Sequence, residues 1–518
     1  MGKLRIFLAA VLLVAAISAG AADEIPSDKR YTVEKQPLFT IDKKLHLYNV
    51  VLSTDRKKVA LVCGKNQKFY VWTESRGKTE TFQQIPRVNF SPAGSRIAWL
   101  GDRKDGIYVY VDGVKHGPYA GLAADSVVFS PDESSYAFIT GRGRPHRSFK
   151  DFTVVIDGKE SPRYKHMFTS LPQFSPDSRK AVYFAGDDKH WFSVVNGIEG
   201  PKFDKTGNGP VFSPDGSLMA YTGFMNDSVY VVVNDSIHGG FWEFQEMHFS
   251  PTSNDLVYCA RKDTAGTFQI YFNHQPVEGW HASQWPVFSP HGERLAFWAS
   301  DSLGQHAVVD SFVSDAHPYV LRLYFSPGGE HFYYTWSPEL SKDGIMSVTY
   351  VVDGKEFPTM TGALQRPSRY WSPDDSRFAY AWDITDKEDA ICIDGVVDSG
   401  YILLGDVVFS PDSKRWAYLG QKKGDEGVRL YLDGKVITRE ASIGANVVFS
   451  PDSRDVAYFV TSPDKKRYLV INDTEYEHFQ NVFPTKVAFS DDGSITYYAL
   501  QDNTVYRVTV RPAEMDSR

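Results

Sequence analysis

One short motif recurs along almost the whole of this 518-residue chain: an aromatic residue followed by Ser-Pro-Asp. Its clearest copy is Phe212-Ser213-Pro214-Asp215-Gly216, which lies between two runs of β-favouring residues. Proline fixes φ at the first central position of a turn, aspartate accepts hydrogen bonds from nearby backbone, and glycine tolerates a positive φ. Two β-favouring runs joined by such a turn predict a β-hairpin.

The spacing of the motif's serine indicates that this hairpin is part of a repeat. Twelve copies follow one another at intervals of 37 to 46 residues. The serines are Ser53, Ser91, Ser130, Ser175, Ser213, Ser250, Ser289, Ser326, Ser372, Ser410, Ser450 and Ser490. The first and last copies lack the proline, and such degenerate copies are typical of the ends of a repeat array.

A second turn signal lies about 20 residues after most of the serines, as in Asp112-Gly113 and Asp353-Gly354. Type I′ hairpin turns favour Asp-Gly pairs because both central residues need a positive φ. Each repeat therefore predicts four antiparallel strands in about 40 residues, the size of a β-propeller blade. We predict an all-β fold, a β-propeller of twelve four-stranded blade repeats. A β-solenoid or a string of sandwiches is the alternative, and it fits the repeat length less well.

Twelve blades exceed the four to eight that one propeller ring usually contains. Two six-bladed rings, residues 22–275 and 276–512, are the economical interpretation, while seven plus five blades or one very large ring remain open. The last repeat lacks its fourth strand, and residues 31–41 form an extra strand-like run before the first serine. We expect this N-terminal strand to close a ring, because closure removes an exposed strand edge.

The repeat resembles a known family. Residues 212–221, Phe-Ser-Pro-Asp-Gly-Ser-Leu-Met-Ala-Tyr, are similar to the WD40-like PD40 repeat of TolB-like β-propellers. Related repeats occur in propellers attached to prolyl-oligopeptidase-type peptidases. The resemblance covers residues 45–510 and implies the propeller fold, but it implies little about function. Two departures stand out: no α/β domain like that of TolB is expected before the blades, and no peptidase domain after them.

The first 21 residues have the pattern of a cleavable signal peptide. Lys3 and Arg5 precede an apolar run over residues 6–17, and Ala19-Gly20-Ala21 supplies the small residues of a cleavage site. A retained anchor is the alternative, but the apolar run is short for a membrane span. We therefore expect a periplasmic or secreted protein with no integral membrane segment after signal removal. Cleavage would change the net charge from −8 to −10, which argues against nucleic-acid binding.

The sequence contains no recognisable catalytic or cofactor-binding motif. It lacks the nucleophile elbow, the zinc-protease helix, the P-loop and the dinucleotide-binding glycine pattern. The three cysteines lie far apart within apolar runs, as buried free thiols do. The aspartate of the repeated turn is expected to bind local backbone rather than a metal. We therefore predict a protein that is not an enzyme and has no cofactor, no metal and no catalytic residues.

Candidate binding residues are those that interrupt the repeat. In a four-stranded blade the two conserved turns share one edge, and the variable loops lie on the other edge, where binding residues concentrate. A basic loop at residues 141–147 contains Arg142, Arg144, His146 and Arg147. It suits an acidic partner or an anionic glycan, although a solvated insertion is the simpler alternative.

The second group of candidate residues is expected at the ring mouths, four positions before the serines. Arg322, Asp406 and Lys486 make the mouth of the second ring the more polar of the two. The favoured hypothesis is an exported non-enzymatic scaffold, resembling TolB-type propellers, that binds a protein or glycan partner through its variable loops. The alternative is a propeller enzyme, a lyase or a glycoside-active protein, with acid and base residues at a ring mouth.

Overall fold

The computed structural model describes residues 31–122, 127–142, 150–167, 171–339, 345–385, 387–437, 442–472 and 474–513. Every element of regular secondary structure in these ranges is a β-strand, which confirms the all-β prediction. No described segment forms a helix that is long and apolar enough to cross a membrane. The predicted signal peptide, residues 1–21, lies outside the described residues.

The strands fall into consecutive groups, one group for each sequence repeat, which we call units 1 to 12. In chain order they are β2–β5 (46–78), β6–β9 (88–119), β10–β13 (128–160), β14–β18 (166–199), β19–β23 (205–241), β24–β27 (243–276), β28–β31 (282–313), β32–β35 (319–356), β36–β39 (360–404), β40–β43 (408–436), β44–β47 (442–475), and β48–β50 with β1 (481–512 and 31–40). Within the described residues they form seven four-stranded sheets, two five-stranded sheets and one twelve-stranded sheet that covers units 8 to 10. All pairings are antiparallel, as in propeller blades.

The repeated motif forms the turn that the sequence predicts. Ser213 is buried; its Oγ donates to Asp215 Oδ1 at 2.6 Å and accepts the Leu218 N–H at 2.9 Å. Asp215 Oδ1 also accepts the Ser217 N–H at 2.9 Å. These bonds hold the pKa of Asp215 well below its usual range. The same serine-to-aspartate bond occurs at Ser53, Ser130, Ser175, Ser372, Ser410 and Ser450. The aspartate therefore stabilises the turn, as expected.

The second turn also agrees with the prediction. Asp112 and Gly113 have φ values of 50° and 82°, and Asp353 and Gly354 have 47° and 81°. These values satisfy the type I′ requirement for two positive φ angles. The turn connects β8 (Gly106–Val111) to β9 (Val114–Tyr119) in unit 2, and equivalent hairpins connect the outer strands of other units.

An arginine five positions after the repeat serine links neighbouring units. This role was not predicted from the sequence. The Nε and Nη2 atoms of Arg377 donate to Asp394 Oδ2 at 2.8 and 2.6 Å within unit 9. Its Nη1 donates to the Lys414 carbonyl in unit 10 at 3.0 Å. The same pair of contacts, to an Asp-turn carboxylate and to the next unit's backbone, is made by Arg96, Arg294 and Arg415.

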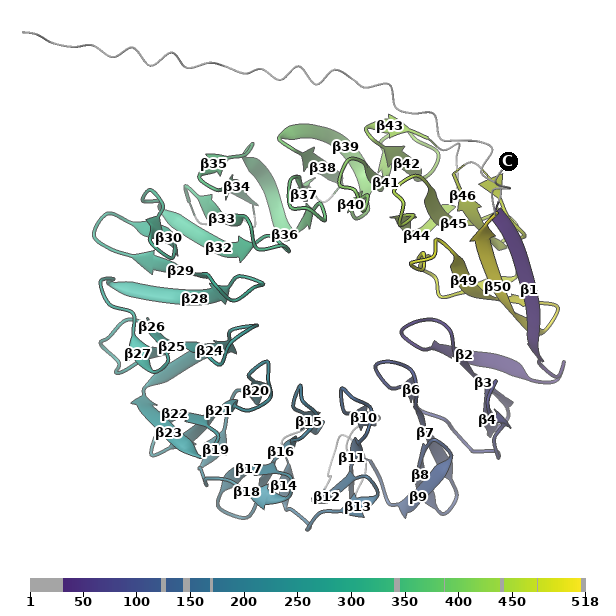
Figure 1. The fold of residues 1–518 in the computed structure, drawn as a ribbon, viewed down its shortest axis with the longest axis horizontal. Coiled ribbons are helices and arrows are strands. Elements are labelled where there is room, and N and C mark those ends of the chain that lie inside the picture. The colour runs from purple at the N-terminus through teal and green to yellow at the C-terminus, as the bar shows by residue number, and fades with distance from the viewer. Residues whose placement is uncertain are drawn as a thin grey trace, which may run out of the picture.

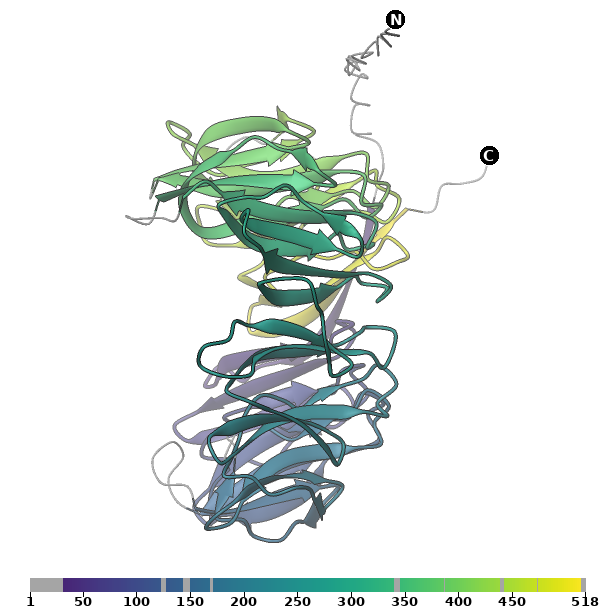
Figure 2. The ribbon, with the colours of Figure 1, turned by 90° about the vertical axis from the view of Figure 1, so that its left-hand side faces the viewer.

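The core consists of apolar clusters between the units. Twelve clusters among the described residues each join two consecutive units. One of them joins unit 12 to unit 1, where Tyr498 and Val505 pack with Leu61. Figure 1 shows the units following one another around one open centre, and in Figure 2 the sheets are seen from the side, stacked face to face.

The two six-bladed rings inferred from counting, residues 22–275 and 276–512, are not confirmed by this arrangement. Units 6 and 7 flank the expected boundary, yet Val257 and Ile270 of unit 6 pack with Phe297 and Val308 of unit 7. The interface is of the same kind as those between the other units. The usual limit of four to eight blades in one propeller ring therefore does not mark a ring boundary between units 6 and 7.

The N-terminal strand closes the circuit of units, as the sequence analysis expected. β1 (Tyr31–Thr40) pairs with β50 (Thr504–Pro512) over its whole length, from Tyr31 opposite Pro512 to Thr40 opposite Thr504. It becomes the outermost strand of unit 12, next to β50 in Figure 1. A strand from one end of the chain thus completes the sheet at the other end, which leaves no unpaired edge on β50.

Candidate partner-binding site

A polar pocket of about 420 Å³ lies between units 2 and 3, on the edge that carries the variable loops. Its walls come from β9 in unit 2 and from β11 (Tyr136–Arg142), β12 (Lys150–Ile156) and β13 (Lys159–Glu160) in unit 3. Its charged lining residues are Arg142, Asp151, Glu160 and Arg163. We call it the Arg142–Arg163 pocket.

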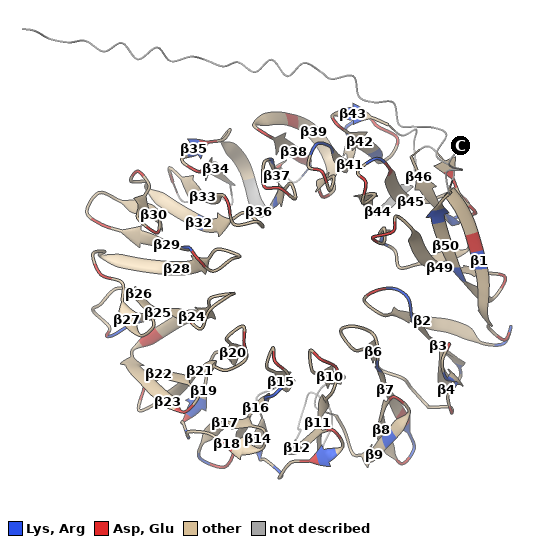
Figure 3. Ribbon diagram, viewed as in Figure 1, with Lys and Arg blue, Asp and Glu red and all other residues tan. Residues whose placement is uncertain are grey.

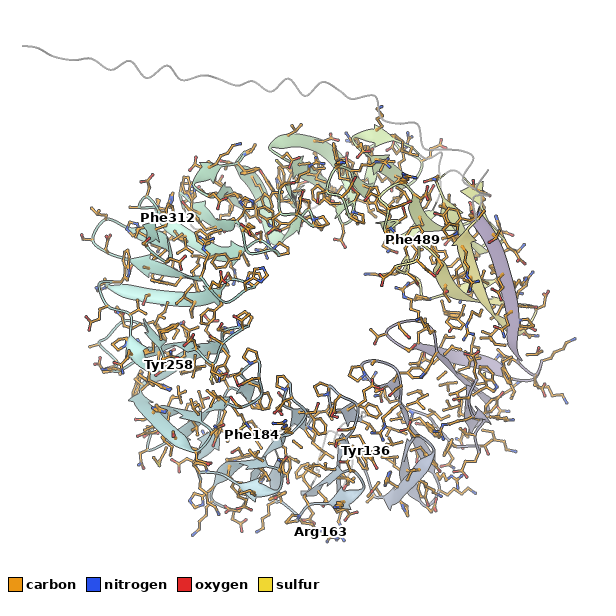
Figure 4. All side chains as sticks on the ribbon, in the orientation of Figure 1. Tyr136, Arg163, Phe184, Tyr258, Phe312 and Phe489 are labelled. Atoms are coloured by element: carbon orange, nitrogen blue, oxygen red, sulfur yellow. The ribbon has the colours of Figure 1, made fainter. Side chains whose placement is uncertain are left out.

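Backbone pairing at the end of unit 3 positions Arg163. Phe152 and Tyr164 exchange two backbone hydrogen bonds of 2.8 and 2.9 Å, so the segment after β13 lies along β12. This pairing brings Arg163 beside Asp151 and Thr153. Arg142 enters the pocket from the end of β11, next to a β-bulge. Figure 4 shows Arg163 at the outer edge of the ring.

The pocket carries both signs of charge. Arg142, Arg163, Asp151 and Glu160 are all exposed, and neither arginine forms an ion pair with a carboxylate in the described residues. Tyr119 lines the same pocket, and burial, with a contribution from Glu160, raises the pKa of its phenol to about 12. The phenol therefore remains a neutral donor at physiological pH. Two guanidinium groups and a phenol provide donors for an anionic group.

The structure includes only part of the predicted basic loop in this pocket. Arg142 lines the pocket, whereas Arg144, His146 and Arg147 lie outside the described residues. Arg163, Asp151 and Glu160 were not predicted from the sequence. The Phe152–Tyr164 bridge that gathers them recurs in other units, for example as Trp191–Phe203 and Arg467–Phe479, but the combination of Asp151 and Arg163 beside it does not recur.

The three predicted mouth residues are exposed and lie in three different units. Arg322 lies on β32 (Tyr319–Phe325) of unit 8, Asp406 precedes unit 10's first strand, and Lys486 lies in unit 12. Asp406 Oδ1 accepts the Tyr370 hydroxyl at 2.7 Å, and the Lys486 carbonyl accepts Arg56 Nη1 at 3.1 Å. No hydrogen bond or ion pair in the described part of the chain joins any two of the three. The expectation of a polar site at the ring mouth stays a prediction.

Asp406 instead lines a small hollow of about 70 Å³ between units 9 and 10. Asp383 and Asp389, which are directly opposite each other on paired strands, line it as well. Burial, together with the neighbouring Asp383 carboxylate, raises the pKa of Asp389. A carboxyl group with a raised pKa beside two further carboxyl groups is an arrangement that general acids use.

Charge is distributed unevenly around the ring. Figure 3 shows acidic residues on the inner turns beside β10 and β15, where the repeat aspartates Asp132 and Asp177 lie.

Among the described residues, no group of three or more histidine, cysteine or carboxylate side chains is arranged to hold a metal ion. Cys63, Cys259 and Cys392 are free and buried, as predicted, and burial raises the pKa of the Cys63 thiol to about 11.

Comparisons with known proteins do not assign a family. No family model matches the chain, and no curated protein matches it. Among solved structures it is similar to a eukaryotic initiation factor, with 13% identity over 87% of this chain and 98% of that one, at a TM-score of 0.33. It is also similar to Kuenenia stuttgartiensis hydrazine synthase, with 14% identity, coverage of 59% and 95%, and a TM-score of 0.24. A third structure, the dihydro-heme d1 dehydrogenase NirN in complex with DHE, shows 13% identity, coverage of 59% and 74%, and a TM-score of 0.29. Scores this low carry no argument about function.

Proposed function

We propose that this protein is an exported, non-enzymatic scaffold that binds an acidic group of a protein or glycan partner in the Arg142–Arg163 pocket. In this proposal the twelve repeats form a single closed propeller-like ring, and the variable-loop edge presents the binding residues. The signal-peptide pattern of residues 1–21 supports a periplasmic or secreted location. The similarity of the repeat to TolB-like propellers agrees with a binding role.

The observation that carries the proposal is the convergence of Arg142 and Arg163 on one pocket. The volume of about 420 Å³ is within the range of roughly 300–1,000 Å³ that ligand sites occupy. Guanidinium groups suit carboxylate, sulfate and phosphate because their planar donors can bind two oxygens at once. Asp151 and Glu160 on the same rim disfavour a ligand with many adjacent charges. They favour a ligand with one anionic group flanked by hydroxyl or amide donors.

Binding of two defined probes tests the proposal. The probes are a labelled peptide with one glutamate flanked by serine and asparagine, and a labelled neutral oligosaccharide with one terminal glucuronate. Fluorescence anisotropy gives the affinity of each for the wild-type chain and for an Arg142→Ala/Arg163→Ala variant. We expect one probe to bind and the double variant to weaken it by at least about tenfold, or 1.4 kcal/mol. The better probe distinguishes a protein partner from a glycan.

Arg179→Ala is the matched control, because its side chain is 86% exposed on a repeat turn away from the pocket. It should leave the affinity unchanged. Failure of both probes to bind, or equal losses in the control and the double variant, would contradict the proposal.

A second candidate function, an enzyme with acid–base residues, rests on the hollow lined by Asp383, Asp389 and Asp406. The raised pKa of Asp389 is the observation that favours it. The test is a panel of uronate-containing and neutral polysaccharides as substrates. An enzyme is supported over a scaffold if the wild-type chain turns one of them over and both Asp389→Asn and Asp406→Asn lose this activity. Turnover that persists in both variants would exclude this hollow as the catalytic site.

A further inference from the structure

We propose that a second pocket, between units 5 and 6, binds one sugar ring of a neutral glycan. The pocket has a volume of about 240 Å³ and lies between β21 (Met219–Met225) and β22 (Ser228–Val233) on one side and the start of β24 (Glu243–Phe249) on the other. We call it the Trp242 pocket. It shares no residue with the Arg142–Arg163 pocket, so the proposal does not depend on the function proposed above.

One wall of the Trp242 pocket is aromatic. Trp242 is 50% exposed, although large aromatic side chains are mostly buried in this fold. Its backbone is fixed, because the Trp242 N–H donates to the Arg261 carbonyl at 2.9 Å. Phe224 and Phe244 extend the apolar surface and pack against the core cluster between units 5 and 6. The indole is therefore held at the pocket while half of its surface remains in solvent.

The other wall presents hydrogen-bond acceptors. The Asn208 N–H donates to Thr222 Oγ1 at 2.7 Å, and Asn208 Nδ2 donates to the Gln245 carbonyl at 3.2 Å. The second bond orients the side-chain amide, and in the described residues no donor engages its Oδ1. One carboxylate oxygen of Glu243 pairs with Arg261, which leaves the other oxygen able to accept. Both residues line the pocket.

Gly207 lets the backbone of this wall pack closely against Thr222 and Phe224. A Cβ atom at this position would meet Thr222 Oγ1 at 2.4 Å and the Phe224 ring at 2.8 Å. A larger residue would therefore displace Phe224 or Thr222, both of which line the pocket.

A sugar ring matches this combination of walls. One face of a pyranose presents C–H groups that pack on an aromatic face, while its edge presents hydroxyl groups that donate to acceptors. An apolar ligand would leave the Asn208 and Glu243 acceptors unpaired. An anion would meet the Glu243 carboxylate. The volume is below the roughly 300 Å³ at which pockets for drug-sized ligands begin, so it suits one ring of a longer chain.

An array of immobilised neutral oligosaccharides tests the proposal, with chains that end in glucose, galactose, mannose, xylose, fucose or N-acetylglucosamine. We expect the wild-type chain to retain at least one of them, and calorimetry with the soluble form gives its affinity. Trp242→Ala should weaken this binding by about tenfold or more, the loss expected when an aromatic anchor is truncated. Trp242→Phe should restore most of the affinity, since it keeps an aromatic face.

Two controls separate binding from folding. Trp285→Ala removes the exposed tryptophan of unit 7, which is 38% exposed and does not line the pocket, so it should bind like the wild type. An unchanged urea midpoint for Trp242→Ala shows that the fold is intact. The proposal is overturned if the array retains no neutral glycan, or if Trp242→Ala binds as tightly as Trp285→Ala. Loss of sugar binding with unchanged binding of the single-glutamate peptide would show that the two pockets act separately.

Discussion

Arg377→Ala should destabilise the ring, because this side chain joins units 9 and 10. Its guanidinium is bound to Asp394 through two N–H groups and to the Lys414 carbonyl through a third. It also lies over the Trp416 ring, 4.3 Å from the centroid. Only 18% of the side chain is exposed. Truncation therefore removes an ion pair within unit 9 and two contacts with unit 10.

Each contact can be assigned a rough magnitude. A partly exposed ion pair contributes up to about 1 kcal/mol, a hydrogen bond to a backbone carbonyl about 1 kcal/mol, and a cation–π contact about 1 kcal/mol. Arg377→Ala should then lower the free energy of unfolding by about 3 kcal/mol. Arg377→Lys keeps the charge but loses the planar fork of donors, so about half of that loss is expected.

Urea unfolding followed by circular dichroism measures the effect as a shift of the midpoint at constant slope. Arg179→Ala is the matched control, since its guanidinium lies 3.9 Å from the Asp177 carboxylate and its side chain is 86% exposed. It should change stability by less than about 0.5 kcal/mol. If Arg377→Ala behaved like Arg179→Ala, the inference that these arginines join the units would be refuted.

Two further outcomes follow from the repeat core and from a histidine pair. Phe212 is half-buried against the cluster that contains Tyr221, so Phe212→Ala should cost about 2 kcal/mol, less than the 3–5 kcal/mol of a fully buried phenylalanine, and urea unfolding measures it. The His238 and His274 rings stack with centroids 3.7 Å apart. Burial lowers the pKa of His274, and the neighbouring His238 charge lowers it further. The pKa of His274 in the folded state is therefore below its unfolded value of about 6.5. Below about pH 6.5 the unfolded chain binds a proton that the folded chain does not, so the free energy of unfolding is highest above this pH and falls as the pH falls. The urea midpoint should drop between pH 7.5 and 5.5, and His274→Gln should reduce the drop; an equal drop in the variant would contradict this assignment.

Local features of this fold could be predicted from the sequence because short-range chemistry determines them. Ser213, Asp215 and the Asp112-Gly113 pair form the turns that their residue types favour. The strand at residues 31–41 pairs with the last repeat because that repeat lacks an outer strand. These contacts involve only the residues of one repeat or one unpaired edge.

Features that depend on several units could not be predicted in the same way. The number of units around the centre depends on the packing angle between sheets, which the sequence of one repeat does not encode. Arg377 follows a turn, where a basic residue is expected to be exposed, and only the neighbouring unit reveals the partner that covers it. Arg163 and Trp242 lie outside the repeat pattern, so their pockets become visible only when adjacent units are in place.

Closure of all units into one ring is the central claim, and a disulfide across its closing strands tests it most directly. Thr40 and Thr504 are partners on β1 and β50, and their Oγ1 atoms lie 3.0 Å apart on the exposed surface. We predict that Thr40→Cys/Thr504→Cys forms a disulfide in the native protein under mild oxidation, detected by mass spectrometry. If β1 instead closed a first ring of six blades, the cross-link would form in Thr40→Cys/Gln275→Cys, whose second cysteine lies on the outer strand β27 (Gln275–Pro276) of unit 6. A cross-link to position 275 and none to position 504 would contradict the single ring.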